Sequence, residues 1–344
     1  MLAPAIAAVR LAVRTALAPF EGADATVLVA LSGGADSLAL AAAAAFEAPR
    51  LGIRAVSITV DHGLQAGSAD VAARAAEQAR ALGMAEARVV RVDVGSEGGP
   101  EAAARDARRA ALRAAALDTG AAGVLLGHTL DDQAETVLLG LARGAGAGSL
   151  AGMAPRRLDE RGLAWLRPLL GLRRDDTGAF CAASGLDAWD DPHNVDDRFS
   201  RVRVRRAILP VLERELGPGV AEALARTAEQ LREDNEAFAD MIDEVIEDIV
   251  EHVEAGIAIS VPALAANPPA LRHRIIRHVA QSEFGVALTR RQTLEVARLV
   301  SDWRGQGPLD LPGFTAARTA GLVSLVARAD DTPSADTTVE GTPA

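Results

Sequence analysis

The sequence contains no lysine and no tyrosine, and aromatic residues make up only 3% of its 344 residues. All 36 basic side chains are therefore arginines. A GC-rich coding sequence is the most direct explanation of this bias. Its chemical consequence is that phosphates can be bound here only by arginine, histidine, hydroxyls, backbone amides or a metal ion. Any lysine-type amine that takes part in a reaction must come from another molecule.

Cysteine is also scarce, since Cys181 stands alone and cannot form an internal disulfide. This favours a reducing compartment, and we expect a cytoplasmic protein. No run of 18 or more apolar residues lacks charge, so we predict no transmembrane helix and no membrane partner. The segment Met1–Phe20 is apolar like a targeting peptide, but Arg10 and Arg14 lie on one helical face. This spacing favours an amphipathic helix docked on the protein.

The net charge of −11 is unevenly distributed along the chain. The segment 218–256 holds 12 acids and 2 arginines, whereas 257–328 holds 4 acids and 9 arginines. The length suits two domains. We predict a first domain over 1–217, an acidic linker over 218–256 with a helix over about 220–253, and a small basic domain over 257–328. The tail, 329–344, is expected to be disordered.

Strand-like and helix-like segments alternate in the first half of the chain. Aliphatic runs predict strands over Val27–Leu31, Ile53–Val60, Arg88–Val94 and Gly123–Leu126. Alanine-rich segments predict helices over Ser37–Glu47, Ala69–Leu82 and Pro100–Thr119. Such a pattern is typical of a parallel sheet covered on both faces, with its more polar third strand near an edge. The predicted fold class is α/β, with a Rossmann-type first domain and a smaller mixed α/β domain at the end.

A glycine-rich turn follows the first predicted strand and opens a helix. Its residues are Ser32, Gly33, Gly34, Ala35, Asp36 and Ser37. Glycines let backbone amides approach phosphate oxygens, a helix N-terminus attracts anions, and the two serines add hydroxyl donors. A carboxylate beside phosphate requires a cation between them, so Asp36 is predicted to bind Mg²⁺. The turn lacks the Gly-Lys-Ser/Thr of a Walker loop. A simple helix-capping turn is the alternative.

A second polar cluster, Gly127–Thr136, follows the fourth predicted strand and begins a helix expected over 131–143. The carboxyl ends of parallel strands share one sheet edge, so this cluster is expected to face the glycine-rich turn. Asp132 and Glu135 are three apart and share a helical face. Helix capping by Asp131 or Asp132 is the alternative. His128 could contact a nucleotide, transfer a proton or be structural, and the sequence leaves this open.

Arginines form two further polar strings. Arg105 and Arg108 share one side of a predicted helix with Glu101, and five arginines follow Asp191-Pro-His-Asn194 within nine residues: Arg198, Arg201, Arg203, Arg205 and Arg206. The functional interpretation is contact with phosphates of ATP or RNA, and the alternative is a solvated surface. The glycine-rich stretch Gly144–Gly152 is expected to be a loop.

These strings together resemble one family, the tRNA(Ile)-lysidine synthetases of the PP-loop ATP pyrophosphatase superfamily. The resemblance covers about Val27–Leu212, in family order. It rests on Ser32–Ser37, Val60–Leu64, Glu101–Arg108, Gly127–Thr136, Leu138–Gly146, Leu150–Met153, Arg167–Leu170 and Asp191–Pro210. The sequence departs from the family pattern at Arg109, Thr129 and Val202. The last part resembles the family's first accessory domain more loosely, and the chain looks like a short form without a further C-terminal domain.

The resemblance implies an ATP-dependent ligase with an adenine nucleotide alpha hydrolase-like domain. The C2 oxygen of the wobble cytidine in tRNA(Ile) with anticodon CAU is adenylated, and free L-lysine then replaces AMP to give lysidine. It implies ATP contacts by Ser32–Ser37, Val60 and Gly127 and lysine binding by Asp132 and Glu135. Catalytic roles are expected for these two acids and for Asp36, His128 and Arg205. Contacts with RNA or phosphate are expected at Arg105, Arg108, Arg143, Arg198, Arg201, Arg203, Arg205 and Arg206.

The basic C-terminal segment is expected to contact tRNA phosphates too, through Arg272, Arg274, Arg277, Arg290 and Arg291. Two other functions are considered. A tRNA thiolase of the same superfamily needs paired cysteines, and Cys181 is alone. A nucleotide-sensing regulator without catalysis does not account for the acids of the second cluster. The sequence leaves the oligomeric state open, with a homodimer among the states it allows.

Overall fold

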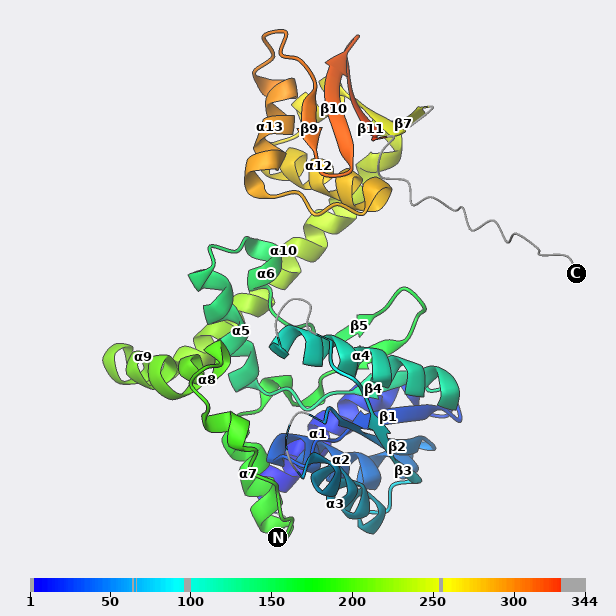
Figure 1. The fold of residues 1–344 in the computed structure, drawn as a ribbon, viewed down its shortest axis with the longest axis vertical. Coiled ribbons are helices and arrows are strands. Elements are labelled where there is room, and N and C mark those ends of the chain that lie inside the picture. The colour runs from blue at the N-terminus through cyan, green and yellow to red at the C-terminus, as the bar shows by residue number, and fades with distance from the viewer. Residues whose placement is uncertain (1–2, 64, 66, 96–99, 254–255, 329–344) are drawn as a thin grey trace, which may run out of the picture. The chain divides into compact units, whose positions relative to one another are not determined.

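The computed structural model describes residues 3–63, 65, 67–95, 100–253 and 256–328. The chain divides into two compact units, 1–232 and 233–344. Figure 1 labels most of their helices and strands. The tail expected to be disordered, 329–344, lies outside the described residues. No helix among the described residues is long and apolar enough to span a membrane.

Unit 1 contains a six-stranded sheet with the order β3-β2-β1-β4-β6-β5. The strands are β1 (Thr26–Ala30), β2 (Arg54–Asp61), β3 (Glu86–Arg91), β4 (Gly123–Leu125), β5 (Arg156–Leu158) and β6 (Ala164–Leu166). The first five in the spatial order pair in parallel, and β5 is antiparallel to β6. The four strands predicted from the sequence are confirmed, and β3 lies at an edge as expected. The short hairpin β5–β6 was not predicted.

Helices cover both faces of this sheet. The main ones are α1 (Pro4–Leu17), α2 (Ala35–Glu47), α3 (Ser68–Ala81), α4 (Pro100–Thr119) and α7 (Arg174–Ala183). One face packs against α1, α2, α3 and α7 through a large apolar cluster. The other face packs against α4, whose Leu112, Ala115 and Ala116 meet Leu28, Val56 and Trp165. The parallel sheet with helices on both sides is therefore confirmed.

The N-terminal segment forms the docked amphipathic helix that its charge spacing predicted. Val9, Val13 and Leu17 of α1 are fully buried, at a spacing that places them on one side of the helix. On its exposed side, Arg14 donates to the carboxylate of Glu47 at the end of α2, with a distance of 2.8 Å between Nε and Oε2. Glu47 is fully buried, so this ion pair provides its charge with a partner.

A helical region completes unit 1. It comprises α5 (Leu130–Ala142), α6 (Ala147–Leu150), α8 (Ser200–Arg203), a π-helical turn (Val204–Ile208), α9 (Leu209–Leu216) and the first part of α10 (Val220–Ile249). The glycine-rich stretch after α5 is not entirely a loop, because its residues 147–150 form the short helix α6. The π-helical turn contains Arg205 and Arg206 of the arginine string.

Unit 2 is the smaller mixed α/β part. Its sheet, with the order β7-β8-β11-β10-β9, is antiparallel. The strands are β7 (Val250–Val253), β8 (Gly256–Ser260), β9 (Leu309–Leu311), β10 (Phe314–Thr319) and β11 (Leu322–Ala327), and the helices are α11 (Val261–Ala266), α12 (Pro269–Phe284) and α13 (Arg290–Ser301). The acidic helix was expected to reach Val253, but it ends at Ile249 and the chain continues as β7. Ile242 and Ile249 of α10 belong to the apolar core of this unit.

Candidate active site

The glycine-rich turn lies between the carboxyl end of β1 and the first turn of α2. Gly33 has a φ of +89°, a backbone conformation that side chains disfavour, and its carbonyl accepts a hydrogen bond from the backbone of Trp189. Ser37 is buried and donates to the carbonyl of Gly34, while its oxygen accepts from the backbone amide of Ser32. The Ser37 hydroxyl therefore shapes the turn, and Ser32 is the exposed serine of the pair.

The end of β4 approaches this turn closely. A Cβ atom on Gly127 would lie 3.2 Å from the backbone of Asp36 and Ser37, so only glycine allows the two segments to meet without a shift. This contact places α5, which begins three residues later, beside the N-terminus of α2. The shared sheet edge expected for the two polar clusters is confirmed by this geometry.

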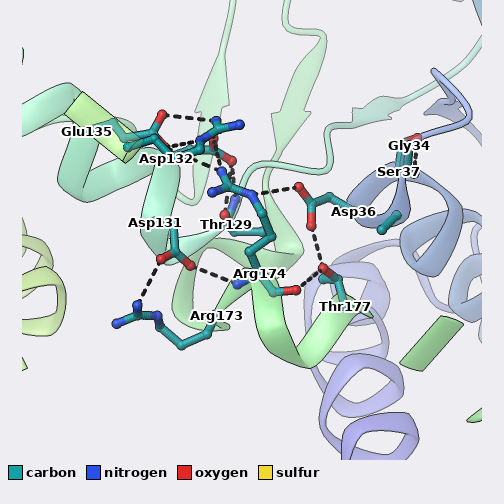
Figure 2. Close-up of polar contacts among 12 residues, drawn as sticks. Gly34, Asp36, Ser37, Thr129, Asp131, Asp132, Glu135, Arg173, Arg174 and Thr177 are labelled. Atoms are coloured by element: carbon teal, nitrogen blue, oxygen red, sulfur yellow. Dashed lines mark hydrogen bonds and ion pairs between the residues drawn. The ribbon is translucent and has the colours of Figure 1, made fainter. Parts of the chain in front are cut away.

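Three carboxylates from two helices surround Arg174 of α7 (Figure 2). Its guanidinium lies 3.5 Å from Asp36, 2.9 Å from Asp132 and 3.5 Å from Glu135. Thr177, one turn further along α7, donates a hydrogen bond to the other oxygen of Asp36. Arg174 thus connects the carboxylate of the glycine-rich turn to the acids of α5.

Arg205, from the π-helical turn, approaches the same acids. It donates to Glu135 through Nε at 2.7 Å and through Nη2 at 3.2 Å, and it lies 3.5 Å from Asp132. The Glu135 side chain is completely buried, whereas the two arginines are each 28% exposed. The acids predicted to share a helical face are therefore adjacent, and in this structure arginines neutralise them.

Asp132 also has a structural role at the start of α5. Thr129 is the N-cap residue, and its backbone amide and hydroxyl both approach Oδ2 of Asp132, at 2.8 and 3.1 Å. The opposite oxygen, Oδ1, contacts Arg174. Capping and the contact with Arg174 are thus properties of one side chain. The N-cap itself is Thr129, and neither Asp131 nor Asp132, which the alternative interpretation considered, occupies that position.

The surroundings shift the pKa values of Asp36 and Asp132 in opposite directions. Burial raises the pKa of Asp36, and the hydrogen bond from Thr177 and the charge of Arg174 oppose that shift only in part. Burial also acts to raise the pKa of Asp132, but Arg174, the Thr129 amide and Arg205 outweigh it and lower this pKa. Asp132 is thereby held as a carboxylate, while Asp36 would be stabilised in its charged form by an additional cation.

His128 lies between Gly127 and α5 in a cationic environment. Burial, aided by the charges of Arg108, Arg167 and Arg201, lowers its pKa to about 4, although the charge of Asp132 acts in the opposite direction. Its Nδ1 atom is buried and has no hydrogen-bond partner among the described residues. The imidazole is therefore neutral at pH 7, which suits a hydrogen-bonding role or a base with a low affinity for protons.

A cavity of about 340 Å³ opens beside Ser32. Its walls combine apolar groups such as Val60 with the side chains of His62, Arg108, Trp189 and His193. Gln65 donates to Asp191 at 3.1 Å and lies 2.7 Å from Nδ1 of His193 at one side of the cavity. A cavity that combines apolar walls with convergent polar side chains, next to the glycine-rich turn, has the features of a small-molecule site.

The structure separates the arginines that the sequence grouped together. Arg108 lines the cavity, whereas Arg105 is exposed. Arg143 is exposed at the far end of α5, about 16 Å along the helix from Asp132 at 1.5 Å per residue. Of the string after Asn194, Arg198 pairs with Asp196, and Arg203 and Arg206 bind backbone carbonyls.

Only Arg201 and Arg205 of that string turn towards α5. Arg201 donates to the hydroxyl of Thr136 at 3.2 Å, and Arg205 binds Glu135. The string is therefore not one continuous basic surface, because several of its arginines are already bound to carboxylates or backbone carbonyls of the protein.

Arg173, Arg174 and Thr177 are the residues that sequence reasoning missed. A signal for the two arginines was present, since they stand at the N-terminus of a helix, where the helix dipole disfavours cations. Such a position requires compensating carboxylates, and Arg173 finds them in Asp131 and Glu222, at 3.0 and 2.7 Å. The spacing of residues gave no comparable signal for Thr177.

Comparisons with known proteins agree with this geometry. Residues 9–212 match the family described as PP-loop domain, and residues 259–323 match the TilS substrate binding domain. The tRNA(Ile)-lysidine synthase of Leifsonia xyli subsp. xyli is 63% identical over 302 residues, which are 88% of this chain and 90% of that protein. The chain belongs to the tRNA(Ile)-lysidine synthase family. The enzyme of Salinispora tropica with the same name is 52% identical and covers 94% of this chain and 97% of its own length.

Among solved structures, the fold resembles that of the U34-tRNA thiolase NcsA from Methanococcus maripaludis. The TM-score is 0.57 at 22% sequence identity, over 67% of this chain and 80% of that one. At this identity the likeness concerns the fold alone. The thiolase alternative is not favoured, because the relatives with high identity are tRNA(Ile)-lysidine synthases and the single cysteine, Cys181, is buried.

Proposed function

We propose that this member of the tRNA(Ile)-lysidine synthase family ligates free L-lysine to C2 of the wobble cytidine of tRNA(Ile) with anticodon CAU, at the expense of ATP. The observation that carries the proposal is the contact of Arg174 with Asp36, Asp132 and Glu135. Through it, the phosphate-binding turn and an acid pair suited to an ammonium group lie in one site. Activation by ATP and attack by an amine need this proximity.

The first step transfers AMP to the tRNA. The C2 oxygen of the cytidine attacks the α-phosphorus of ATP, the bond to the β-phosphate breaks, and diphosphate leaves. The nucleoside of ATP would occupy the cavity beside Ser32, and its phosphates would meet the amides of the turn at the α2 N-terminus. Arg108, which lines the cavity, is placed to contact a phosphate.

The residues present fit Mg²⁺ bound together with ATP. Among the described residues, no three acidic, histidine or cysteine side chains form a metal cluster, so a site built from protein ligands alone does not exist there. Mg²⁺ commonly uses one or two carboxylates plus substrate phosphates. Asp36, whose pKa burial raises, is the carboxylate available at the turn. The ion would neutralise charge on the departing diphosphate.

In the second step the ε-amine of lysine attacks C2, a proton leaves the nitrogen, and the C2–O bond to AMP breaks. Asp132 and Glu135 are proposed to bind the ammonium form of lysine, in exchange for part of their contacts with Arg174 and Arg205. A freed guanidinium would then be available to the phosphate charge that develops nearby. Asp132, held as a carboxylate, or neutral His128 would accept the proton.

Incubation of the protein with ATP, labelled lysine and transcripts of tRNA(Ile) and tRNA(Met) tests this function. We expect label in the isoleucine species alone, with one AMP and one diphosphate released per lysine incorporated. Diphosphate release without transfer of label would contradict lysine as the amine substrate. No release with any combination would support the nucleotide-sensing alternative.

A further inference from the structure

Four arginines gather around the β5–β6 hairpin of unit 1, apart from the acids of α5. Arg157 on β5 lies opposite Trp165 in the strand register, and Arg109 on α4 stacks over the Trp165 ring at 5.1 Å from its centre. Arg167 follows β6 directly and donates to the carbonyl of Ala154. Arg232 donates to the carbonyls of Ala151 and Met153, which precede Ala154 by three residues and one residue. We call these four residues the arginine cluster.

The platform under this cluster is rigid. Asp159, at the turn of the hairpin, accepts hydrogen bonds from the indole of Trp165, from Arg113 of α4 and from the backbone amides of Arg161 and Leu163. Trp165 itself is 2% exposed. The hairpin is thus fixed to α4 and to its own turn, so the arginines it carries need little reorganisation to receive a ligand.

The charge of the arginine cluster is not compensated within the described part of the chain. None of its four guanidiniums lies within 4.0 Å of a carboxylate there. Burial and the charges of Arg109, Arg157 and Arg232 lower the pKa of Arg167 to about 10. The Nε atom of Arg167 is also buried without a hydrogen-bond partner among the described residues. Four like charges held together on a fixed platform are suited to an anion that carries several charges.

The arginine cluster lies at the sheet edge that bears the candidate active site. Strand β6 pairs in parallel with β4, so Arg167 and His128 follow the same ends of neighbouring strands. The charge of Arg167 helps to lower the pKa of His128. The phosphate-binding turn, in contrast, follows β1, which is two strands from β6 in the sheet, or about 10 Å at 4.8 Å per strand. One ATP on that turn would leave the cluster free for a second polyanion.

We propose that the arginine cluster binds backbone phosphates of the RNA substrate next to the nucleotide that enters the active site. This inference rests on the proposed function, because it assigns the RNA strand to one side of that site. A chain of phosphodiesters presents several anionic groups at regular intervals, which a single metabolite does not. The phosphate contacts would fix the position of the strand and leave the choice of base to other groups.

The test compares two single variants and a matched control in the full-length protein. Arg157→Gln and Arg109→Gln remove members of the arginine cluster that form no ion pair with the described residues. Arg156→Gln is the control, since Arg156 is exposed on the same strand, where successive side chains point to opposite faces. Binding of tRNA is measured against salt concentration, and KM is measured for tRNA and for ATP.

We expect each cluster variant to weaken tRNA binding several-fold and to reduce the slope of log K against log salt by about 0.7–0.9 for each phosphate that the variant no longer binds. Their KM for ATP should stay at the wild-type value, and Arg156→Gln should behave as wild type. Unchanged tRNA affinity and slope would refute the proposal, and so would a rise in KM for ATP alone. Wild-type protein that makes no lysidine would refute the proposed function instead. The salt dependence of tRNA binding would still test whether the arginine cluster binds RNA phosphates.

Discussion

Two regions at one sheet edge use arginine in opposite ways. At the start of α5, the guanidinium of Arg174 lies within 3.5 Å of three carboxylates, and Arg205 shares two of them. Around β6, the charges that shift the pKa of Arg167 belong to three other arginines. In the first region the charges of the arginines are balanced by carboxylates of the protein, whereas the second region has positive charge left for a ligand. In a chain whose basic residues are all arginines, the position of the acids therefore distinguishes structural or substrate-exchanging arginines from phosphate-binding ones.

The largest effect in the first region is expected from Asp36→Asn. The change removes the carboxylate proposed to hold Mg²⁺ with ATP and also one partner of Arg174. Loss of a group that stabilises developing charge costs about 10²–10³-fold in rate. Diphosphate release with saturating tRNA and ATP measures the effect, and raising Mg²⁺ should recover only part of it. Asp70→Asn, which changes an exposed acid in the first turn of α3, is the control. Wild-type release by Asp36→Asn would show that the carboxylate plays no part in ATP activation.

A second change separates amine binding from ATP activation in the same region. In the double variant Asp132→Asn/Glu135→Gln, the acids keep their shape but lose the charge that an ammonium group needs. We expect KM for lysine to rise about 10- to 100-fold, with a smaller effect on diphosphate release in the absence of lysine. Steady-state kinetics with labelled lysine measure both. Glu77→Gln on α3 is a control at an exposed acid. A normal KM and turnover for lysine would mean that the ammonium is bound elsewhere.

The difference between the two regions can be tested by the stability of two variants, each of which removes one arginine charge from one region. Arg174→Gln leaves Asp132 and buried Glu135 with fewer cations, and we expect the free energy of unfolding to fall by about 2 kcal/mol or more, because breaking a buried pair exposes an uncompensated charge to a low dielectric. Arg167→Gln loses one hydrogen bond to Ala154 but relieves repulsion among arginines, so a change within about 1 kcal/mol is expected. Urea unfolding followed by the fluorescence of Trp165 and Trp189, in a Trp303→Phe background, compares them. Equal losses in the two variants would contradict the distinction.

Features that depend on residues close together in the chain could be predicted from the sequence, whereas contacts between distant residues could not. The strand–turn–helix around Ser32–Ser37 and the helix starting near Asp131 were predicted because short-range patterns specify them. The role of Arg174 could not be, since its partners Asp36 and Asp132 are 138 and 42 residues away. The β5–β6 hairpin was missed because each strand has three residues and Arg156 and Arg157 give β5 a charged sequence.

The same reason explains the dispersal of the arginine string after Asn194. From spacing alone, Arg198 and Arg205 belonged to one basic surface free of acids. In the structure, Arg198 pairs with Asp196, just before the string, and Arg205 pairs with Glu135, 70 residues earlier in the chain. Charge counted along the chain therefore did not indicate which arginines keep a free charge.

The smallest effect is expected from the proton affinity of His128, which the unpaired arginines help to lower. Its pKa of about 4 lies below the ordinary value of 6.5, so between these pH values the unfolded chain binds a proton that the folded protein does not. Folding stability should therefore fall as the pH falls from 6.5 towards 4, by on the order of 1 kcal/mol at pH 6 and more at pH 5. In His128→Asn this component of the pH dependence should be absent, whereas His252→Asn, at an exposed histidine of β7, should retain it. Urea unfolding at pH 5, 6 and 7 measures the three proteins. An equal pH dependence in wild type and His128→Asn would show that the histidine is not held neutral, and the cationic surroundings of the sheet edge would then have to be screened by solvent.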